Sequence, residues 1–85
     1  MKKRGKDEIR QKNKLYLGSL HMEISGNREV ILEGNRGILE YTDRSIKINA
    51  GKCVVAFSGR GLHIQCMNEC DVVIKGFITC IEYLI

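Results

Sequence analysis

Apolar and polar residues alternate along most of the chain. Leu20, Met22 and Ile24 alternate with three polar residues, and Ile46 and Ile48 alternate with Lys47 and Asn49. A period of two places successive side chains on opposite faces of a β-strand and fits a helix poorly. The pattern predicts eight short strands, at residues 19–25, 29–33, 37–42, 45–49, 52–57, 61–66, 71–75 and 77–84.

Turn-forming residues separate the predicted strands, and most of the glycines lie there, in the segments 26–27, 34–37, 50–51, 58–61 and 76. The connections are too short for the crossovers that a parallel sheet needs, so the strands should pair antiparallel. The chain has no proline, which removes one device that protects strand edges. The sequence predicts an all-β fold, a small antiparallel β-sandwich of about seven or eight short strands. A short β-solenoid is the alternative, and the lack of a strict repeat disfavours it.

The charge is unevenly distributed along the 85 residues. Residues 1–14 hold seven Lys or Arg and two acidic residues, whereas residues 15–85 hold seven Lys or Arg and eight acidic residues. The first segment has too few apolar residues to offset its ordering entropy. We therefore expect a flexible basic N-terminal tail at 1–14 and one folded domain at 15–85. The longest apolar run has five residues, 53–57, where a membrane-spanning helix needs about 20, and no secretory signal follows the basic start.

The basic tail is a candidate for binding an anionic membrane surface or an acidic partner. Cationic residues near anionic lipid contribute roughly 1 kcal/mol each. Nucleic acid is disfavoured as the partner, because no aromatic residue is interleaved with the basic residues to stack on bases. A solubilising tail without a specific target is the simplest alternative. The candidate residues are Lys2, Lys3, Arg4, Lys6, Arg10, Lys12 and Lys14.

Four arginines, Arg28, Arg36, Arg44 and Arg60, lie in or beside predicted turns. If they gathered at one end of the sandwich, their planar guanidinium groups could bind a carboxylate or phosphate through paired hydrogen bonds. Turns at both ends would instead scatter them over the surface, which is the simpler expectation. Arg36 and Arg60, which lie in glycine-rich segments, are taken as candidate partner-binding residues.

The cysteines and histidines give little indication of catalysis. Cys53 and Cys66 share strand faces with apolar residues, and buried thiols are expected for the four cysteines, Cys53, Cys66, Cys70 and Cys80. The spacing of the four cysteines lacks the paired knuckles of a zinc ribbon, and disulfides are disfavoured without an export signal. His21 and His63 fall on polar faces. We expect no catalytic residue, no cofactor and no metal, although a thiol or metal site that includes His63 is a hypothesis to test.

Several short segments, in their order and spacing, resemble the YabP/YqfC family of sporulation proteins, and the YqfC-like branch within it. These are GNREVILEG (26–34), GILEY (37–41), IKI (46–48), FSGRGLHI (57–64) and IKGFITCIEY (74–83). The resemblance covers about residues 15–85 and contains no catalytic signature. It implies a small all-β protein of endospore-forming bacteria, made in the mother cell and needed to assemble the outer layers of the spore. It also implies a membrane protein partner from the same programme.

The sequence and the resemblance together predict a non-enzymatic assembly module. It would lie in the cytoplasm of the mother cell, peripheral to the membrane that faces the forespore, and its open strand edges would allow it to form a homo-oligomer. A nucleic-acid-binding module that uses the basic tail is the alternative.

Overall fold

The computed structural model describes residues 13–17 and 20–85, and this part of the chain is all-β. The strands pair antiparallel, as predicted. Their bounds are β1 (Asn13–Leu17), β2 (Leu20–Ser25), β3 (Glu29–Glu33), β4 (Ile38–Tyr41), β5 (Ser45–Asn49), β6 (Val54–Met67) and β7 (Asp71–Leu84). β1 was not among the predicted strands. Residues 1–12, which make up most of the predicted tail, lie outside the described residues.

The seven strands form one sheet in the order β1-β2-β3-β7-β6-β5-β4. β1 and β4 are its two ends, and the sheet is not closed. The alternative of a solenoid is wrong, since β7 returns from the end of the chain to pair between β3 and β6. This non-local pairing has no counterpart in a stack of successive coils.

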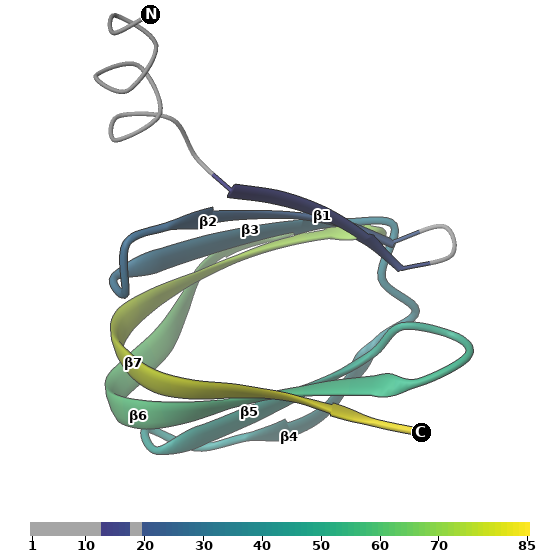
Figure 1. Ribbon diagram of the computed structural model, residues 1–85. Helices are drawn as coiled ribbons and strands as arrows, with labels where there is room; N and C mark the ends of the chain where they lie inside the picture. Colours follow the sequence, from purple (N-terminus) through teal and green to yellow (C-terminus); the bar gives the residue numbers. More distant parts are fainter. Residues whose placement is uncertain (1–12, 18–19) are drawn as a thin grey trace, which may run out of the picture.

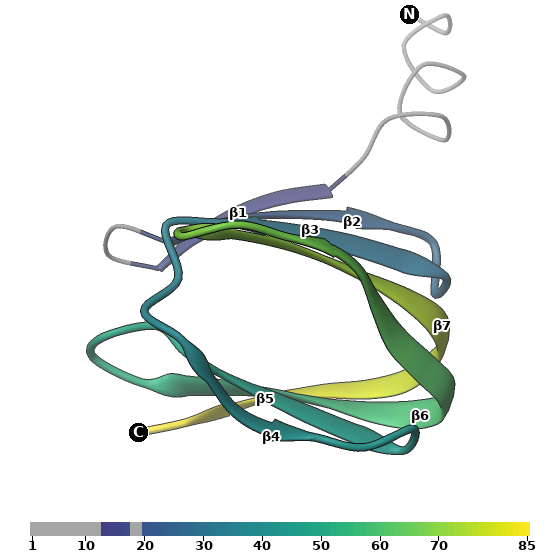
Figure 2. The ribbon, with the colours of Figure 1, turned by 180° about the vertical axis from the view of Figure 1, so that it is seen from behind.

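Two long, bent strands turn this sheet into a sandwich. β6 and β7 each have 14 residues and run from one layer into the other (Figure 1). β1, β2 and β3 lie in one layer with the start of β7, whereas β4 and β5 lie in the other layer with the start of β6. The same two layers are seen from behind in Figure 2. The sandwich prediction is confirmed, with both layers belonging to one folded sheet.

The predicted breaks at 58–61 and 76 are bends within strands and not turns between them. At these bends β6 and β7 approach so closely that two glycines are required. A Cβ at Gly59 would overlap the carbonyl of Phe77, and a Cβ at Gly76 would lie 2.6 Å from the carbonyl oxygen of Gly61. The ladder register also shifts between Ser58 and Gly59. Glycine in a strand commonly marks such a bulge or a close backbone approach.

The core lies between the two layers and confirms the alternation read from the sequence. Most of the alternate apolar residues of β2, β3 and β5 are fully buried, as is Phe57 of β6, and Ile24 at the end of β2 is partly buried against them. Asn35, in the β3–β4 connection, is a buried polar residue. Its Nδ2 donates to the carbonyl oxygen of Cys70 at 2.6 Å, and its Oδ1 accepts from the amide of Gly37 at 3.0 Å. The side chain thus satisfies its own polar groups and ties the connection to the β6–β7 turn.

All four cysteines are free thiols. The prediction that they are buried is wrong for three of them. Cys66, Cys70 and Cys80 are exposed, whereas Cys53 is half-buried against the core. The reason at Cys66 is a register shift between Ile64 and Cys66 that reverses the alternation and pairs Cys66 with Val73 on the outer face. Because a bulge adds one residue to one strand, every side chain after it changes face.

Candidate partner-binding site

Two turns and two strand bends meet at one end of the sandwich, on the left in Figure 1. We call this region the bent end and define it as residues 26–29, 42–45, 59–63 and 75–78. The β2–β3 turn is attached to β7, because the carbonyl of Asn27 accepts from the amide of Ile78 at 2.8 Å. The carbonyl of Arg28 accepts from the amide of Gly76 at 3.1 Å. These two bonds hold the backbone of Arg28 beside Phe77.

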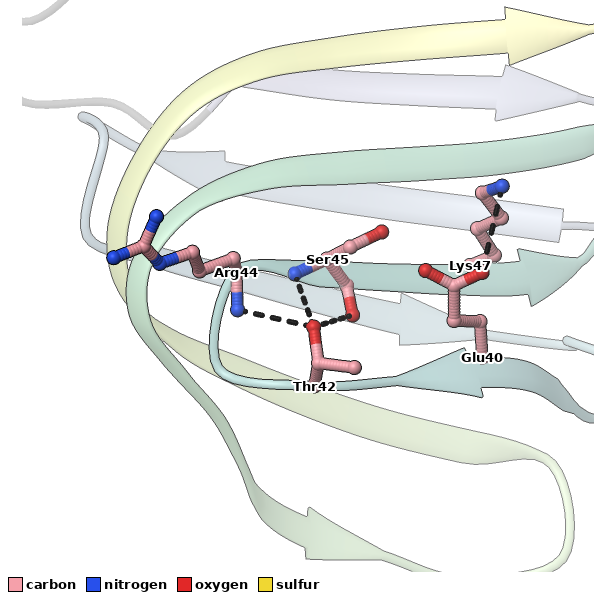
Figure 3. Close-up of polar contacts among 5 residues, drawn as sticks. All are labelled: Glu40, Thr42, Arg44, Ser45 and Lys47. Atoms are coloured by element: carbon pink, nitrogen blue, oxygen red, sulfur yellow. Dashed lines mark hydrogen bonds and ion pairs between the residues drawn. The ribbon is translucent and has the colours of Figure 1, made fainter.

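The β4–β5 turn is attached to β6 in the same way. The carbonyl of Arg44 accepts from the amide of Gly59 at 3.1 Å, and the carbonyl of Asp43 accepts from the amide of Leu62 at 2.9 Å. Within the turn, Thr42 Oγ1 accepts from the amides of Arg44 at 3.2 Å and Ser45 at 2.9 Å (Figure 3). The hydroxyl therefore fixes the turn that carries Arg44.

The same hairpin carries an exposed ion pair next to the bent end. Lys47 Nζ lies 3.5 Å from Glu40 Oε1 (Figure 3). A hydrogen bond from Ser45 and the positive charge of Lys47 lower the pKa of Glu40 below its ordinary value. Both groups favour the charged carboxylate, which outweighs the small opposing effect of desolvation.

Two arginines lie over one exposed aromatic ring at the bent end. The Cζ atoms of Arg28 and Arg60 are each 5.9 Å from the centroid of the Phe77 ring. The ring is 41% exposed, and Arg60 is the ladder partner of Phe77 across β6 and β7. A guanidinium at this distance is attracted by the negative face of the ring. We call these three residues the Arg–Phe–Arg cluster.

The charges of the cluster are not neutralised within the described part of the chain. Among residues 13–17 and 20–85, neither Arg28 nor Arg60 has a carboxylate oxygen within 4 Å. Both side chains are exposed. Two cationic groups are therefore positioned by a ring and remain available to an anion.

A surface hollow of about 320 Å³ lies beside the cluster. Arg28, Glu29, His63, Lys75 and Gly76 line it. Lys75 stands opposite Glu29 on β3 and opposite His63 on β6, so the lining crosses three neighbouring strands. The Nδ1 of His63 lies 3.2 Å from the carbonyl oxygen of Gly61. The hollow thus places one carboxylate among two cationic side chains and an imidazole.

A second hollow, more apolar and about 330 Å³, lies between β4 and the last part of β6. Ile38, Tyr41 and residues 64–67 line it, and Tyr41 and Met67 are exposed. The amide of Ile64 donates to the hydroxyl of Tyr41 at 3.0 Å. The Tyr41 side chain thus provides the hydrogen-bond acceptor for a backbone amide of β6 that no described strand pairs with on this side.

The structure gathers three of the four turn arginines, Arg28, Arg44 and Arg60, at the bent end. Scattering is therefore the wrong expectation for these three. Arg36 lies at the opposite end, where its amide donates to the carbonyl of Asn49 at 2.8 Å and its side chain lies beside Gly51. The candidate pair Arg36 and Arg60 is not brought together. The two residues belong to different ends of the sandwich, so Arg36 lies outside the candidate site at the bent end.

Most of the basic tail candidates are not placed by the structure. Lys14 is described only as backbone in β1, in register with Glu23. The remaining candidates, Lys2, Lys3, Arg4, Lys6, Arg10 and Lys12, lie outside the described residues. Their role stays a prediction.

Sequence reasoning missed Phe77 and Lys75 as site residues. A signal for Phe77 was present, because Ile74 and Ile78 mark the inward positions of β7 and leave an aromatic ring pointing outward between them. Nothing in the sequence showed that the β2–β3 turn would bring Arg28 to that ring, because this contact depends on the bend of β7.

The described residues contain no group of three or more His, Cys, Asp or Glu side chains arranged to hold a metal ion. A histidine does lie close to two carboxylates on the outer face of β2 and β3. There His21 Nδ1 lies 3.2 Å from Glu33 Oε1, and His21 Nε2 lies 3.7 Å from Glu23 Oε2. Nor does the described part of the chain hold a helix that could cross a membrane.

Comparison with known proteins identifies the family. The sequence model of the YabP family matches residues 18–84. The chain belongs to the YabP family. The match includes β2 to β7, and with them the whole Arg–Phe–Arg cluster. Searches of curated proteins and of solved structures found no match.

Family membership confirms the resemblance read from the short strand segments. It indicates a sporulation-related role for this YabP-family protein, and the YabP family is a sporulation family not known as enzymatic.

Proposed function

We propose that this YabP-family protein is a non-enzymatic assembly module of the mother cell. It contributes to spore envelope formation by docking a membrane protein partner at the bent end. The observation that carries the proposal is the Arg–Phe–Arg cluster, in which two guanidinium groups without a carboxylate partner among the described residues lie over an exposed ring.

The composition of the cluster suits protein recognition. Arginine and aromatic residues are enriched where protein interfaces are most tightly bound, because each combines a large contact area with directional polar groups. The contact with Phe77 restricts Arg28 and Arg60 before any partner arrives. Less side-chain entropy is then lost on binding than with freely moving arginines.

The basic residues of the tail fit the same role at a membrane surface. Held near anionic lipid, they would bias the protein toward the cytoplasmic face of the mother-cell membrane that surrounds the forespore. A partner anchored in that membrane would then meet the bent end at a raised local concentration. The tail would contribute membrane location and the bent end would contribute docking, so substitutions in one should leave the other in place.

Co-purification from sporulating cells tests this function. The full chain carries an affinity tag, and the membrane proteins retained by the wild type are identified by mass spectrometry. The Arg28→Gln/Arg60→Gln variant should lose the membrane partner and assemble the spore envelope incompletely. The control is Arg36→Gln/Lys52→Gln, which removes the same charge away from the bent end and should retain the partner. Equal retention by both variants would rule out docking at the bent end.

A further inference from the structure

The basic residues of the folded part are concentrated at the bent end. The bent end holds four of the seven Lys and Arg of residues 15–85, together with two of the eight acidic residues. The rest of this part holds three basic and six acidic residues. The basic residues of the bent end are Arg28, Arg44, Arg60 and Lys75, and its acidic residues are Glu29 and Asp43. The bent end is therefore a local positive region on a domain that is slightly negative overall.

We propose that the bent end binds an acidic, extended peptide segment of a partner protein, with glutamate or aspartate side chains next to apolar ones. This inference rests on the proposed function and names the chemistry of the docking segment. The carboxylates would lie against Arg28, Arg60 and Lys75, and the apolar side chains against the exposed ring of Phe77. Guanidinium groups bind carboxylates through two parallel hydrogen bonds, which a lysine cannot reproduce.

The shape of the region favours a peptide over a lipid surface. The hollow beside the cluster is about 320 Å³, near the lower end of the range of roughly 300–1,000 Å³ for ligand pockets. Glu29 forms part of its wall. A flat anionic membrane would meet this carboxylate together with the arginines. A narrow peptide can place its carboxylates beside the cations alone, so charge complementarity is better satisfied.

The backbone of the bent end holds the binding groups in place. Arg28 is fixed by the hydrogen bond from Gly76 to its carbonyl, and Arg60 is fixed in the ladder opposite Phe77. Each guanidinium group lies 5.9 Å from the centroid of the Phe77 ring, whose negative face attracts its positive charge. A ligand that binds the folded state and not the unfolded chain stabilises the fold, so binding of the peptide should also raise the free energy of unfolding.

Fluorescence anisotropy tests the inference directly with the purified full chain. The probe is a labelled ten-residue peptide that alternates glutamate with leucine, and the control peptide replaces each glutamate with glutamine. The wild type should bind the first peptide and not the second. Binding should weaken roughly tenfold in Arg28→Gln/Arg60→Gln. In Arg36→Gln/Lys52→Gln the affinity for the peptide should stay near the wild-type value, because both replaced residues lie outside the bent end. Any contribution of the basic tail is the same in both variants.

A second measurement locates the peptide. In the wild type, adding the glutamate peptide should shift the NMR signals of the Arg28 and Arg60 side chains and of the Gly76 and Phe77 amides. Vesicles of anionic phospholipid are tested in parallel. Vesicle binding that depends on Arg28 and Arg60 while the peptide does not bind would overturn the inference in favour of a lipid surface. Equal peptide affinity in both double variants would overturn it as well.

The two proposals can fail separately. If the membrane partner is lost in Arg28→Gln/Arg60→Gln cells but the acidic peptide does not bind, the docking function stands and the acidic segment is wrong. If the peptide binds through Arg28 and Arg60 but the partner is retained by the variant, the bent end binds acidic segments and the proposed partner docks elsewhere.

Discussion

The guanidinium carbon of Arg60 lies 5.9 Å from the ring centroid of Phe77, its ladder partner on the neighbouring strand. The contact joins two strands at the point where both bend from one layer of the sandwich into the other. Arg28 lies at the same distance from the ring and comes from a turn more than 40 residues away in sequence. The bend thus assembles a binding surface from residues that are distant in the chain.

A double-mutant cycle between Arg60→Gln and Phe77→Leu should measure this contact. We expect a coupling free energy of about 0.5–1 kcal/mol, the usual value for an exposed cation–π pair. The measurement is the free energy of unfolding in urea for the wild type, both single variants and the double variant. The matched cycle between Arg36→Gln and Phe77→Leu should show no coupling, because Arg36 lies at the other end. Purely additive effects in the Arg60 cycle would show that the ring does not hold the guanidinium.

The bend itself depends on Gly59, which approaches the carbonyl of Phe77 too closely to accept a Cβ. Gly59→Ala should destabilise the protein by about 3 kcal/mol or more, because neither backbone can move without breaking the ladder. Gly26→Ala is the control. A Cβ at Gly26 would meet open space, and the only cost is the strain of a positive φ of 58°. We therefore expect a loss of about 1–2 kcal/mol in the free energy of unfolding. Thermal unfolding followed by circular dichroism compares the two, and similar losses would contradict the close approach.

The alternation of apolar residues was enough to predict an antiparallel all-β sandwich and most of its core. It could not predict that the segments 52–57 and 61–66 belong to one strand, since glycine is used for both turns and bends. Nor could it predict the face of Cys66, because the bulge before it leaves no signal in the periodicity. For the site, the sequence supplied the arginines as candidates but not their grouping around Phe77, which depends on tertiary contacts between distant segments.

The exposure of the cysteines predicts a clear order of reactivity. Cys66, Cys70 and Cys80 should react rapidly with a thiol reagent in the native state, and half-buried Cys53 more slowly. Each exposed cysteine replaced by serine should change the free energy of unfolding by no more than about 0.5 kcal/mol. Cys53→Ser should cost about 1 kcal/mol or more, because it places a hydroxyl against the core. Mass spectrometry of timed labelling checks the first expectation, and four equal rates would contradict it.

The lowered pKa of Glu40 predicts a small effect of acid on the β4–β5 hairpin. A carboxyl group with a lower pKa in the folded state stabilises the fold above its ordinary pKa, and this contribution is lost as the pH falls through the folded value. NMR titration should give a pKa below the ordinary value for Glu40. Ser45→Ala and Lys47→Met should each raise it, because each removes a group that favours the carboxylate. An unchanged pKa in both variants would contradict the assigned causes.

The basic tail and the bent end should make separable contributions at a membrane. A chain that lacks residues 1–12 keeps β1, which begins at Asn13, and loses six of the seven basic residues of the predicted tail. Its binding to anionic vesicles at low salt should fall strongly, because each cation near the surface contributes roughly 1 kcal/mol. Co-sedimentation with vesicles measures the loss, and raising the salt should weaken the full chain toward the shortened one. Arg28→Gln/Arg60→Gln in the full chain should sediment with vesicles nearly as well as the wild type. If this variant loses vesicle binding while the shortened chain retains it, the basic surface that meets the membrane is the bent end and not the tail.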